Sequence, residues 1–347
     1  MRVAIATVQV PFISGGAEIH ARLLQENLVR RGHEADIITI PFKWYPEETL
    51  LDSLRMAALV DLTEVNGETI DAVIALKFPM YALRHPRKTV WLLHQHRQAY
   101  DLWGTPYGDL HTMAAGEAAR EQIMAADNLA LGAARHVYTN SETVSRRLRQ
   151  FNGIPSTPLY HPPRHHARLH SRSYDDFIFY PSRVDAIKRQ ALLVQAAARM
   201  QSSMKIVMAG GGSRAEMKHV RGLMADLGVQ ERVELHDRLS EADLLDLYSR
   251  CRAVYFGGFH EDYGYVPLEG FFASKPVIVH DDAGGPLEFV RTGENGYVIP
   301  PEPDSLAAAM DSLSRDADMA ERLGRRGRQD LLDRRMDWDH VIDSLLR

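Results

Sequence analysis

Short apolar runs alternate with longer amphipathic segments along most of this 347-residue chain. The runs have the length and the Val- and Ile-rich composition of buried strands, while the segments between them repeat their apolar positions at helical spacing. This alternation predicts an α/β protein built on parallel sheets. In the first half we expect strands at 3–8, 35–40, 72–76, 89–93 and 136–139 and helices at 17–31, 48–64 and 114–133.

A proline-rich segment, 152–170, interrupts this pattern. It holds Pro155, Pro158, Pro162 and Pro163 and has no sustained period. Clustered prolines disfavour both helices and strand ladders, so we place a domain boundary here. The predicted domains are 1–160 and 161–336. In the second we expect strands at 177–180, 205–209, 232–235, 253–256, 276–280 and 296–299 and helices at 188–199, 215–227, 241–249, 304–313 and 319–332, with a closing helix at 338–346.

Composition and charge narrow the class of protein. The net charge of −5 argues against a nucleic-acid partner. Cys251 is the only cysteine, which excludes a disulfide within the chain and fits a reducing compartment. The first residues lack the features of a signal peptide, and no apolar run approaches the ~20 residues that span a bilayer. We therefore expect a cytoplasmic protein, with any membrane contact peripheral, at the inner face.

The segment 260–269, His-Glu-Asp-Tyr-Gly-Tyr-Val-Pro-Leu-Glu, is the most informative stretch. It follows a buried strand, so Glu261 should lie on a strand-to-helix loop and Glu269 one to two turns into the next helix. Ligands of open parallel sheets bind at the carboxyl ends of the strands. Gly264 allows a close backbone approach, and two carboxylates are good acceptors for hydroxyl groups. The combination indicates a nucleotide-linked sugar as ligand.

Other loops could hold the phosphates of such a ligand. Arg183 and Lys188 follow the first strand of the second domain, where Lys188 is expected to open a helix and both could bind a pyrophosphate; a solvated loop with scattered charge is an equally good interpretation. The loop Ser14-Gly15-Gly16 precedes the first helix but lacks the G-x-G-x-x-G spacing of dinucleotide-binding proteins. Gly284-Gly285 resembles a third such loop.

Several polar groups have a simpler interpretation. His94 and His96 end a strand and could contact phosphate or sugar oxygens, but a structural role is favoured for at least one of them. The linker histidines are interpreted as solvated rather than as metal ligands; they are His161, His165, His166 and His170. The pairs Asp316/Asp318 and Asp337/Asp339 have an Asp-x-Asp form that can bind metals, but they stand at helix starts, where aspartate is a common capping residue. No metal site is predicted.

Taken together, these motifs resemble the retaining glycosyltransferases of family 4, which have the GT-B architecture. The most specific matches are the E-x7-E element 261–269, the turn and strand 274–278 and the G-E-N-G segment 293–296. Weaker matches are Gly15-Gly16-Ala17-Glu18, Asn140-Ser141-Glu142 and the spaced pair Arg183 and Lys188. Asp262, Gly257-Gly258 and Ser182 depart from the family pattern and bear on sugar identity and loop shape.

The resemblance implies a fold of two Rossmann-like domains facing across a cleft, with the helix 337–347 packing back on the first. It implies that Arg183 and Lys188 hold the donor diphosphate, that Glu269 binds the ribose, and that Glu261 faces the sugar together with the backbone of Gly264, Tyr265 and Val266. Gly15 and Gly16 would lie against the phosphates. His94 would be the active-site histidine, with His96 as the alternative. No metal or other cofactor is implied.

The expected activity is transfer of a mannose- or glucose-type hexose from a GDP- or UDP-linked donor to a glycan or lipid-linked acceptor. Such a hexosyltransferase, of the EC 2.4 class, would serve cell-surface polysaccharide or glycolipid synthesis, and the resemblance favours front-side attack by the acceptor. A GT-B sugar-nucleotide epimerase and a non-catalytic nucleotide-sugar binding subunit remain alternatives. A dehydrogenase is disfavoured because the first strand lacks the dinucleotide fingerprint.

Overall fold

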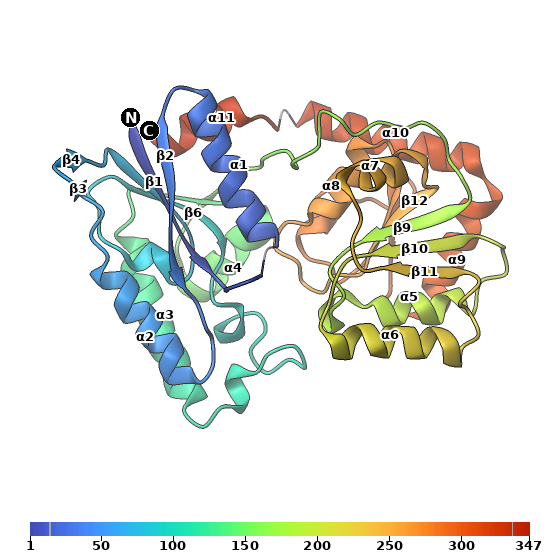
Figure 1. Cartoon of the computed structure of the whole chain (residues 1–347), viewed down its shortest axis with the longest axis horizontal. Coiled ribbons are helices and arrows are strands. Elements are labelled where there is room, and N and C mark those ends of the chain that lie inside the picture. Colours follow the sequence, from blue (N-terminus) through green and yellow to red (C-terminus); the bar gives the residue numbers. More distant parts are fainter. Residues whose placement is uncertain (14, 335) are drawn as a thin grey trace. The chain divides into compact units, whose positions relative to one another are not determined.

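The chain forms two compact α/β units in a computed structural model that describes residues 1–13, 15–334 and 336–347 (Figure 1). The first unit comprises residues 1–164 and 337–347, and the second comprises 165–336. Each contains one six-stranded sheet whose strand pairs are all parallel. The predicted α/β class with two Rossmann-like domains is confirmed. Ser14 of the first glycine loop lies outside the described residues.

The sheet of the first unit has the order β2-β1-β5-β6-β7-β8. Its strands are β1 (Arg2–Gln9), β2 (Glu34–Pro41), β5 (Ala72–Lys77), β6 (Lys88–His94), β7 (His136–Thr139) and β8 (Thr157–Pro158), and a small antiparallel pair is formed by β3 (Glu64–Val65) and β4 (Glu68–Thr69). The helices of this unit are α1 (Gly16–Arg30), α2 (Glu47–Leu59), α3 (Gly116–Gly132), α4 (Glu142–Asn152) and α11 (Trp338–Leu346).

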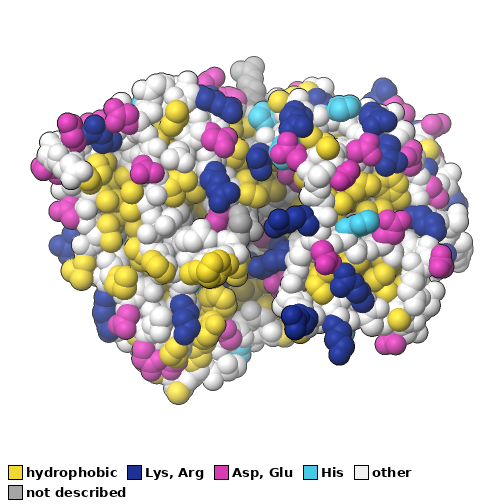
Figure 2. All heavy atoms as spheres, viewed as in Figure 1, with side chains coloured by type: hydrophobic (Ala, Val, Ile, Leu, Met, Phe, Trp, Pro, Cys, Tyr) yellow, Lys and Arg dark blue, Asp and Glu magenta, His cyan; other side chains and the backbone are white. Residues whose placement is uncertain are grey.

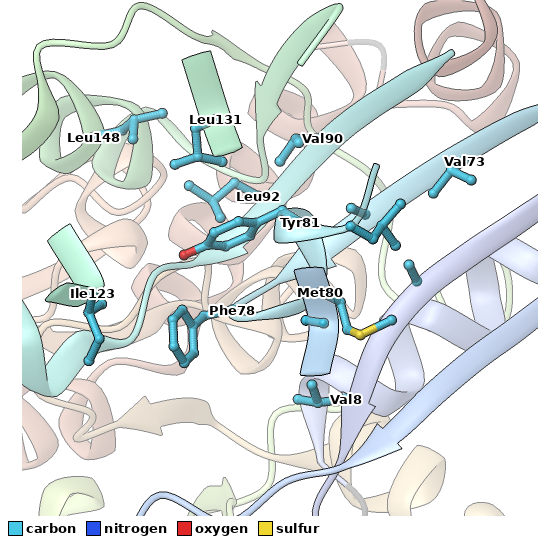
Figure 3. Packing of buried hydrophobic residues seen from close by; sticks show 14 of the residues in the cluster. Val8, Val73, Phe78, Met80, Tyr81, Val90, Leu92, Ile123, Leu131 and Leu148 are labelled. Carbon is cyan, nitrogen blue, oxygen red and sulfur yellow. The ribbon is translucent and has the colours of Figure 1, made fainter. Parts of the chain in front are cut away.

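Alternate residues of these strands enter two different cores, because successive side chains of a strand point to opposite faces. On β6, Val90 and Leu92 join a cluster with α2, α3 and α4, which Figure 3 shows around Tyr81 and Phe78. Trp91 and Leu93 join a second cluster with α1 and α11. Helices therefore cover both faces of the sheet, and α11 belongs to the first unit although it ends the chain.

Two expectations about the proline-rich linker are wrong. Thr157 and Pro158 form β8, which pairs with β7, because a two-residue strand at the sheet edge tolerates proline. His161 is fully buried rather than solvated: its ring packs on Trp91 and Trp338, and its Nε2 lies 3.2 Å from Nδ1 of His20. Burial lowers the pKa of His20 to about 3 and that of His161 well below its ordinary value, so both rings are neutral.

The sheet of the second unit has the order β11-β10-β9-β12-β13-β14. Its strands are β9 (Phe177–Pro181), β10 (Lys205–Ala209), β11 (Val233–His236), β12 (Ala253–Phe256), β13 (Val277–His280) and β14 (Gly296–Ile299). Its helices are α5 (Gln190–Ala197), α6 (Arg214–Asp226), α7 (Glu241–Arg250), α8 (Tyr265–Phe272), α9 (Pro303–Arg315) and α10 (Ala317–Asp333).

The sequence predicts that Lys188 opens a helix, but in the structure it does not. It ends a single 3-10 turn, η4 (Ala186–Lys188), and α5 begins two residues later at Gln190. The break is at Arg189, whose backbone is left-handed with φ 55°. A non-glycine residue in this conformation needs support from its surroundings.

The surface and the helices fit the composition. Figure 2 shows basic and acidic side chains interspersed over the visible face of each unit, as expected for a small net charge. Within the described ranges, no helix has the length and apolar content needed to cross a membrane.

Two helical glycines of the second unit provide a test of this packing. A methyl group at Gly324 of α10 would overlap the main-chain carbonyl of Ser274, whereas one at Gly222 of α6 would meet no atom within 4 Å. We expect Gly324→Ala to destabilise the unit by about 1–3 kcal/mol through overpacking. Gly222→Ala should stabilise it by about 0.5–1 kcal/mol, since alanine has the higher helix propensity.

Thermal unfolding of the two variants beside the wild type measures both effects. Opposite shifts of the melting temperature are expected. A melting temperature of Gly324→Ala equal to or above that of the wild type would show that α10 does not lie against the turn at Ser274.

Candidate functional site

The strand order of the second unit fixes where a ligand can bind. Renumbered along the unit, the strands run 3-2-1-4-5-6, so the chain order reverses between β9 and β12. Doubly wound sheets bind their ligands at the carboxyl ends of the strands on either side of such a reversal. The loop after β9 carries Arg183 and Lys188, and the loop after β12 carries Glu261.

Lys188 and Glu261 meet directly at this reversal point. The Lys188 ammonium donates to Oε2 of Glu261 and lies 5.3 Å from the centre of the Phe256 ring. Both side chains are about one-fifth exposed, at 18% and 25%, so the pair is accessible yet partly withdrawn from water. An ion pair in such a position is stronger than one on the open surface.

The loop that carries Lys188 is held in place by main-chain contacts. The Tyr180 hydroxyl donates to the carbonyl oxygen of Lys188 at 2.6 Å, and Phe259 donates its N–H to the carbonyl of Ile187. A side chain at Gly257 would come within 2.6 Å of the Lys188 carbonyl oxygen. The sequence departs from the family pattern at position 257, and the presence of glycine there therefore has a steric cause.

A second ion pair braces the same loop. Arg189 makes a two-pronged contact with Asp282, at 2.7 and 2.6 Å, and its guanidinium stacks on Phe259. Asp282 follows β13, so this pair ties the loop after β9 to the loop after β13. The same two-pronged contact with Asp282 holds Arg189 in its left-handed backbone conformation.

Arg183 lies apart from this pair. Its guanidinium is 58% exposed and donates to Asp185 at 2.8 Å. Asp185 in turn accepts the N–H of Ile187. The predicted cation pair is therefore asymmetric: Lys188 is half-buried and paired with Glu261, while Arg183 is a surface residue on the same loop.

The start of α8 brings main-chain donors to this edge of the sheet. Gly264 has φ 87°, and a side chain there would come within 2.7 Å of the Pro286 ring. This conformation lets Tyr265 and Val266 begin the helix immediately after the loop. Their N–H groups belong to the first helical turn, which lacks intrahelical acceptors and favours anions.

Glu269 lies one turn further along α8. Its Oε2 accepts the hydroxyl hydrogen of Tyr248 at 2.6 Å. Burial raises the pKa of Glu269 to about 7, against the opposing effect of the Tyr248 hydroxyl. The carboxyl group is thus close to the midpoint of its titration at neutral pH, which is unusual for a glutamate and typical of functional sites.

In the first unit, the glycine loop faces a buried lysine. Gly15 caps α1, and its N–H donates to Glu18 at 2.7 Å. The other oxygen of Glu18 lies 3.6 Å from the ammonium of Lys77, at the carboxyl end of β5. Gly16 is the first residue of α1. The Glu18 side chain already accepts one of the donors expected to face an anion.

The two histidines at the end of β6 occupy different surroundings. His94 is half-buried at the sheet edge, and its Nδ1–H donates to the carbonyl oxygen of Gln95 at 2.6 Å. His96 is buried against Phe78 and Phe42, and burial lowers its pKa to about 3. His96 therefore has a structural role, and His94 is the better candidate for contact with a ligand.

The first aspartate of each Asp-x-Asp pair is confirmed as a helix cap, while Asp318 and Asp339 lie in the first helical turn. Asp316 accepts the N–H of Met319 at 2.7 Å, and Asp337 accepts that of His340 at 2.8 Å. Throughout the part of the chain that the structure describes, no group of three His, Cys, Asp or Glu side chains is placed to hold a metal ion.

Sequence reasoning missed four residues around these sites: Tyr248, Lys77, Arg189 and Asp282. The sequence carried no signal for Tyr248, because its partner Glu269 is 21 positions away on a different helix. The sequence did carry a signal for Lys77, since a charged residue at the end of an apolar parallel strand stands where ligands bind. Arg189 and Asp282 are 93 residues apart, and only the fold brings them together.

The raised pKa of Glu269 predicts a pH dependence of stability. Between the ordinary value of 4.5 and about 7, the folded state binds more protons than the unfolded chain, so this group's contribution to stability falls as pH rises through that window. Glu269→Gln removes the titration and keeps an acceptor for Tyr248. Its melting temperature relative to the wild type should rise between pH 5 and pH 8, reflecting at most about 3 kcal/mol.

The control is Glu231→Gln, at an exposed glutamate of the same unit. Its melting temperature should keep a constant difference from the wild type over this range. The same constant difference for Glu269→Gln would show that the Glu269 carboxyl titrates normally.

Comparison with known proteins agrees with this geometry. Residues 163–330 match the model of the family described as glycosyl transferases group 1. The chain is 25% identical to a D-inositol 3-phosphate glycosyltransferase of Acidothermus cellulolyticus, over 96% of this chain and 85% of that protein.

Solved structures share the fold. Sucrose-phosphate synthase from Thermosynechococcus elongatus superposes with a TM-score of 0.77 at 18% identity, covering 99% of this chain and 97% of that one. Anabaena HepE, in complex with UDP and glucose, superposes with a TM-score of 0.70 at 16% identity, covering 99% of each chain. The chain therefore has the GT-B fold, and most of its second unit matches the glycosyl transferases group 1 family model.

Proposed function

We propose that this protein is a retaining hexosyltransferase that moves a mannose- or glucose-type sugar from a GDP- or UDP-linked donor to a glycan or lipid-linked acceptor. The observation that carries the proposal is the Lys188–Glu261 pair at the chain reversal between β9 and β12. It provides a cation for a diphosphate and a carboxylate for sugar hydroxyls on adjacent loops, and Glu269 is available one turn along α8 for the ribose.

The chemistry of glycosyl transfer makes use of such an arrangement. Breaking the bond between the anomeric carbon and the diphosphate builds negative charge on the leaving phosphate and positive charge on the sugar. A fixed ammonium group aimed at the leaving phosphate stabilises that charge as it grows. The first-turn N–H groups of Tyr265 and Val266 act in the same direction. Arg183 would add a second cation at the outer end of the loop.

The ion pair seen without ligand gives Glu261 a part in donor binding. A diphosphate, with its larger negative charge, competes with Glu261 for Lys188. Once released, the Glu261 carboxylate can accept hydrogen bonds from sugar hydroxyl groups. The pair thus keeps both side chains positioned before the donor arrives, which limits the entropy lost on binding.

In the first unit, we propose that Gly15 and Gly16 offer main-chain donors to phosphate and that His94 contacts the sugar. Nδ1 of His94 is engaged with Gln95, so in the neutral ring Nε2 is an acceptor suited to a hydroxyl group.

We further propose that catalysis needs no metal, because cations from the protein can carry the charge of the diphosphate. Cell-surface polysaccharide or glycolipid synthesis, with peripheral contact at the inner membrane face, would suit a lipid-linked acceptor.

A donor panel followed by a transfer assay tests this proposal. Binding of the correct UDP-, GDP- or ADP-sugar should raise the melting temperature, by the equivalent of about 2.7 kcal/mol at a concentration a hundredfold above Kd. That donor should then yield a product with the same anomeric configuration, at an undiminished rate in EDTA. Activity lost in EDTA and restored by Mg²⁺ or Mn²⁺ would exclude metal independence, and donor consumption without any acceptor would indicate the epimerase.

The two cations should differ in importance. Lys188→Ala should lower kcat/KM by roughly thirtyfold to several thousandfold, corresponding to about 2–5 kcal/mol, with kcat reduced because the lost contact strengthens in the transition state. Arg183→Ala should lower kcat less, since Arg183 is the more exposed of the two. Arg183→Lys should restore only part of that loss, because lysine lacks the forked donor geometry.

The matched control is Lys205→Ala, at an exposed lysine that opens β10 at the opposite edge of the same sheet. It should retain wild-type kinetics. Melting temperatures establish that each variant is folded. Wild-type kcat and KM in a folded Lys188→Ala variant would remove this loop from the active site.

A further inference from the structure

A cavity of about 480 Å³ opens on the second unit, away from the loops described above. Its lining consists of His170, Ser171, Arg172, Ser173, Tyr174, Ser274, Glu321, Arg325 and Arg328. Tyr174 precedes β9 and Ser274 precedes β13. Because all strands of this sheet are parallel, the cavity lies at their amino ends, the edge opposite to Lys188 and Glu261. Binding of the proposed donor at the carboxyl edge does not involve this cavity.

The charge of the lining is strongly one-sided. Three guanidinium groups, those of Arg172, Arg325 and Arg328, stand against the single carboxylate of Glu321. Arg328 donates to the main-chain carbonyls of Leu169 and Phe272, and among the described residues no carboxylate is paired with it. The cavity therefore carries excess positive charge.

The other two arginines can be drawn to a ligand at little cost. Arg325 pairs with Glu321 one turn back on α10, and Arg172 pairs with Asp246 at 2.7 Å. Their side chains are 74% and 58% exposed. Exposed pairs of this kind contribute little stability, so an anion with more charge than one carboxylate can displace them.

A further cation lies behind the lining residues, in contact with two of them. Lys275 is fully buried, and its ammonium donates to the Ser171 hydroxyl at 2.8 Å and to the Ser173 carbonyl, above the ring of Tyr174. Burial lowers the pKa of Lys275 to about 8, so the group is still largely charged at neutral pH. Its hydrogen bonds hold Ser171 and Ser173 of the lining in place, and its charge adds positive potential behind them.

We propose that this cavity binds a small phosphorylated and hydroxyl-bearing metabolite, such as a sugar phosphate, with its phosphate held by Arg172, Arg325 and Arg328. Arginine forks match the geometry of phosphate oxygens. The serine hydroxyls and Glu321 supply partners for sugar hydroxyl groups. The volume is within the range of sites for small organic ligands, roughly 300–1,000 Å³, and exceeds what a bare phosphate needs.

Isothermal titration calorimetry with glucose 6-phosphate and with inorganic phosphate tests the site. The full-length wild type should bind one glucose 6-phosphate with a Kd of ~1 mM or below, and inorganic phosphate more weakly. The double variant Arg172→Ala/Arg325→Ala should weaken binding of both by at least about tenfold.

Two controls make the result specific. Arg326 neighbours Arg325 on α10 and is likewise paired along the helix, with Asp330, while Arg221 pairs with Asp237 elsewhere on the unit; neither lines the cavity. Arg221→Ala/Arg326→Ala therefore removes the same charge and should leave binding unchanged. Lys188→Ala should also leave it unchanged, which separates this cavity from the donor site.

Several outcomes would overturn the assignment. Equal weakening in the two double variants would show a general charge effect, and loss of binding in Lys188→Ala would place the ligand at the donor site. No heat of binding from either ligand up to about 10 mM would remove the site altogether. Equal affinity for the two ligands would exclude the proposed hydroxyl contacts.

Discussion

The contact between Lys188 and Glu261 is the interaction on which the proposed donor site depends. These residues are 73 positions apart, and they meet only because the chain order reverses between β9 and β12. The parallel sheet supplies two adjacent loops that diverge at their carboxyl ends. The neighbouring contacts then hold those loops close: glycine at 257 leaves room for the Lys188 carbonyl, and the Arg189–Asp282 fork fixes the turn.

At the same edge of the sheet, Glu269 is close to half-ionised at neutral pH, and Lys188 is paired with a carboxylate before any ligand binds. Lys188 already has a carboxylate partner, so binding of the proposed donor would exchange one anion for another instead of desolvating a lone cation. Glu269 titrates near neutral pH because burial disfavours its charge while Tyr248 supports it. Groups whose burial is only partly offset by their partners lower the stability of the free protein, and a charged, hydroxyl-rich ligand can stabilise them.

How much of this was predictable follows from the range of each interaction. The alternation of strands and helices, the two sheets and the loop positions of Glu261 and Glu269 could be predicted, because they depend on local periodicity and parallel topology. The start of α5 could not, since Arg189 adopts a left-handed backbone supported by Asp282, far along the chain. Burial of His161 and the partnership of Tyr248 with Glu269 were hidden for the same reason: tertiary packing decides them.

The two edges of the second sheet show how one topology can support different binding chemistry. At the carboxyl edge, glycines and left-handed turns bring main-chain groups and a few charges close together. At the amino edge, α10 lies against the turn at Ser274 through Gly324, and Arg325 and Arg328 line the same cavity as Ser274. Helix α8 runs between the edges. It begins just after Gly264, at the end of the loop of Glu261, and its last carbonyl, that of Phe272, accepts from Arg328. An anion that drew Arg328 away would free that carbonyl, so occupancy of the cavity would be felt at the end of the helix that carries Glu269.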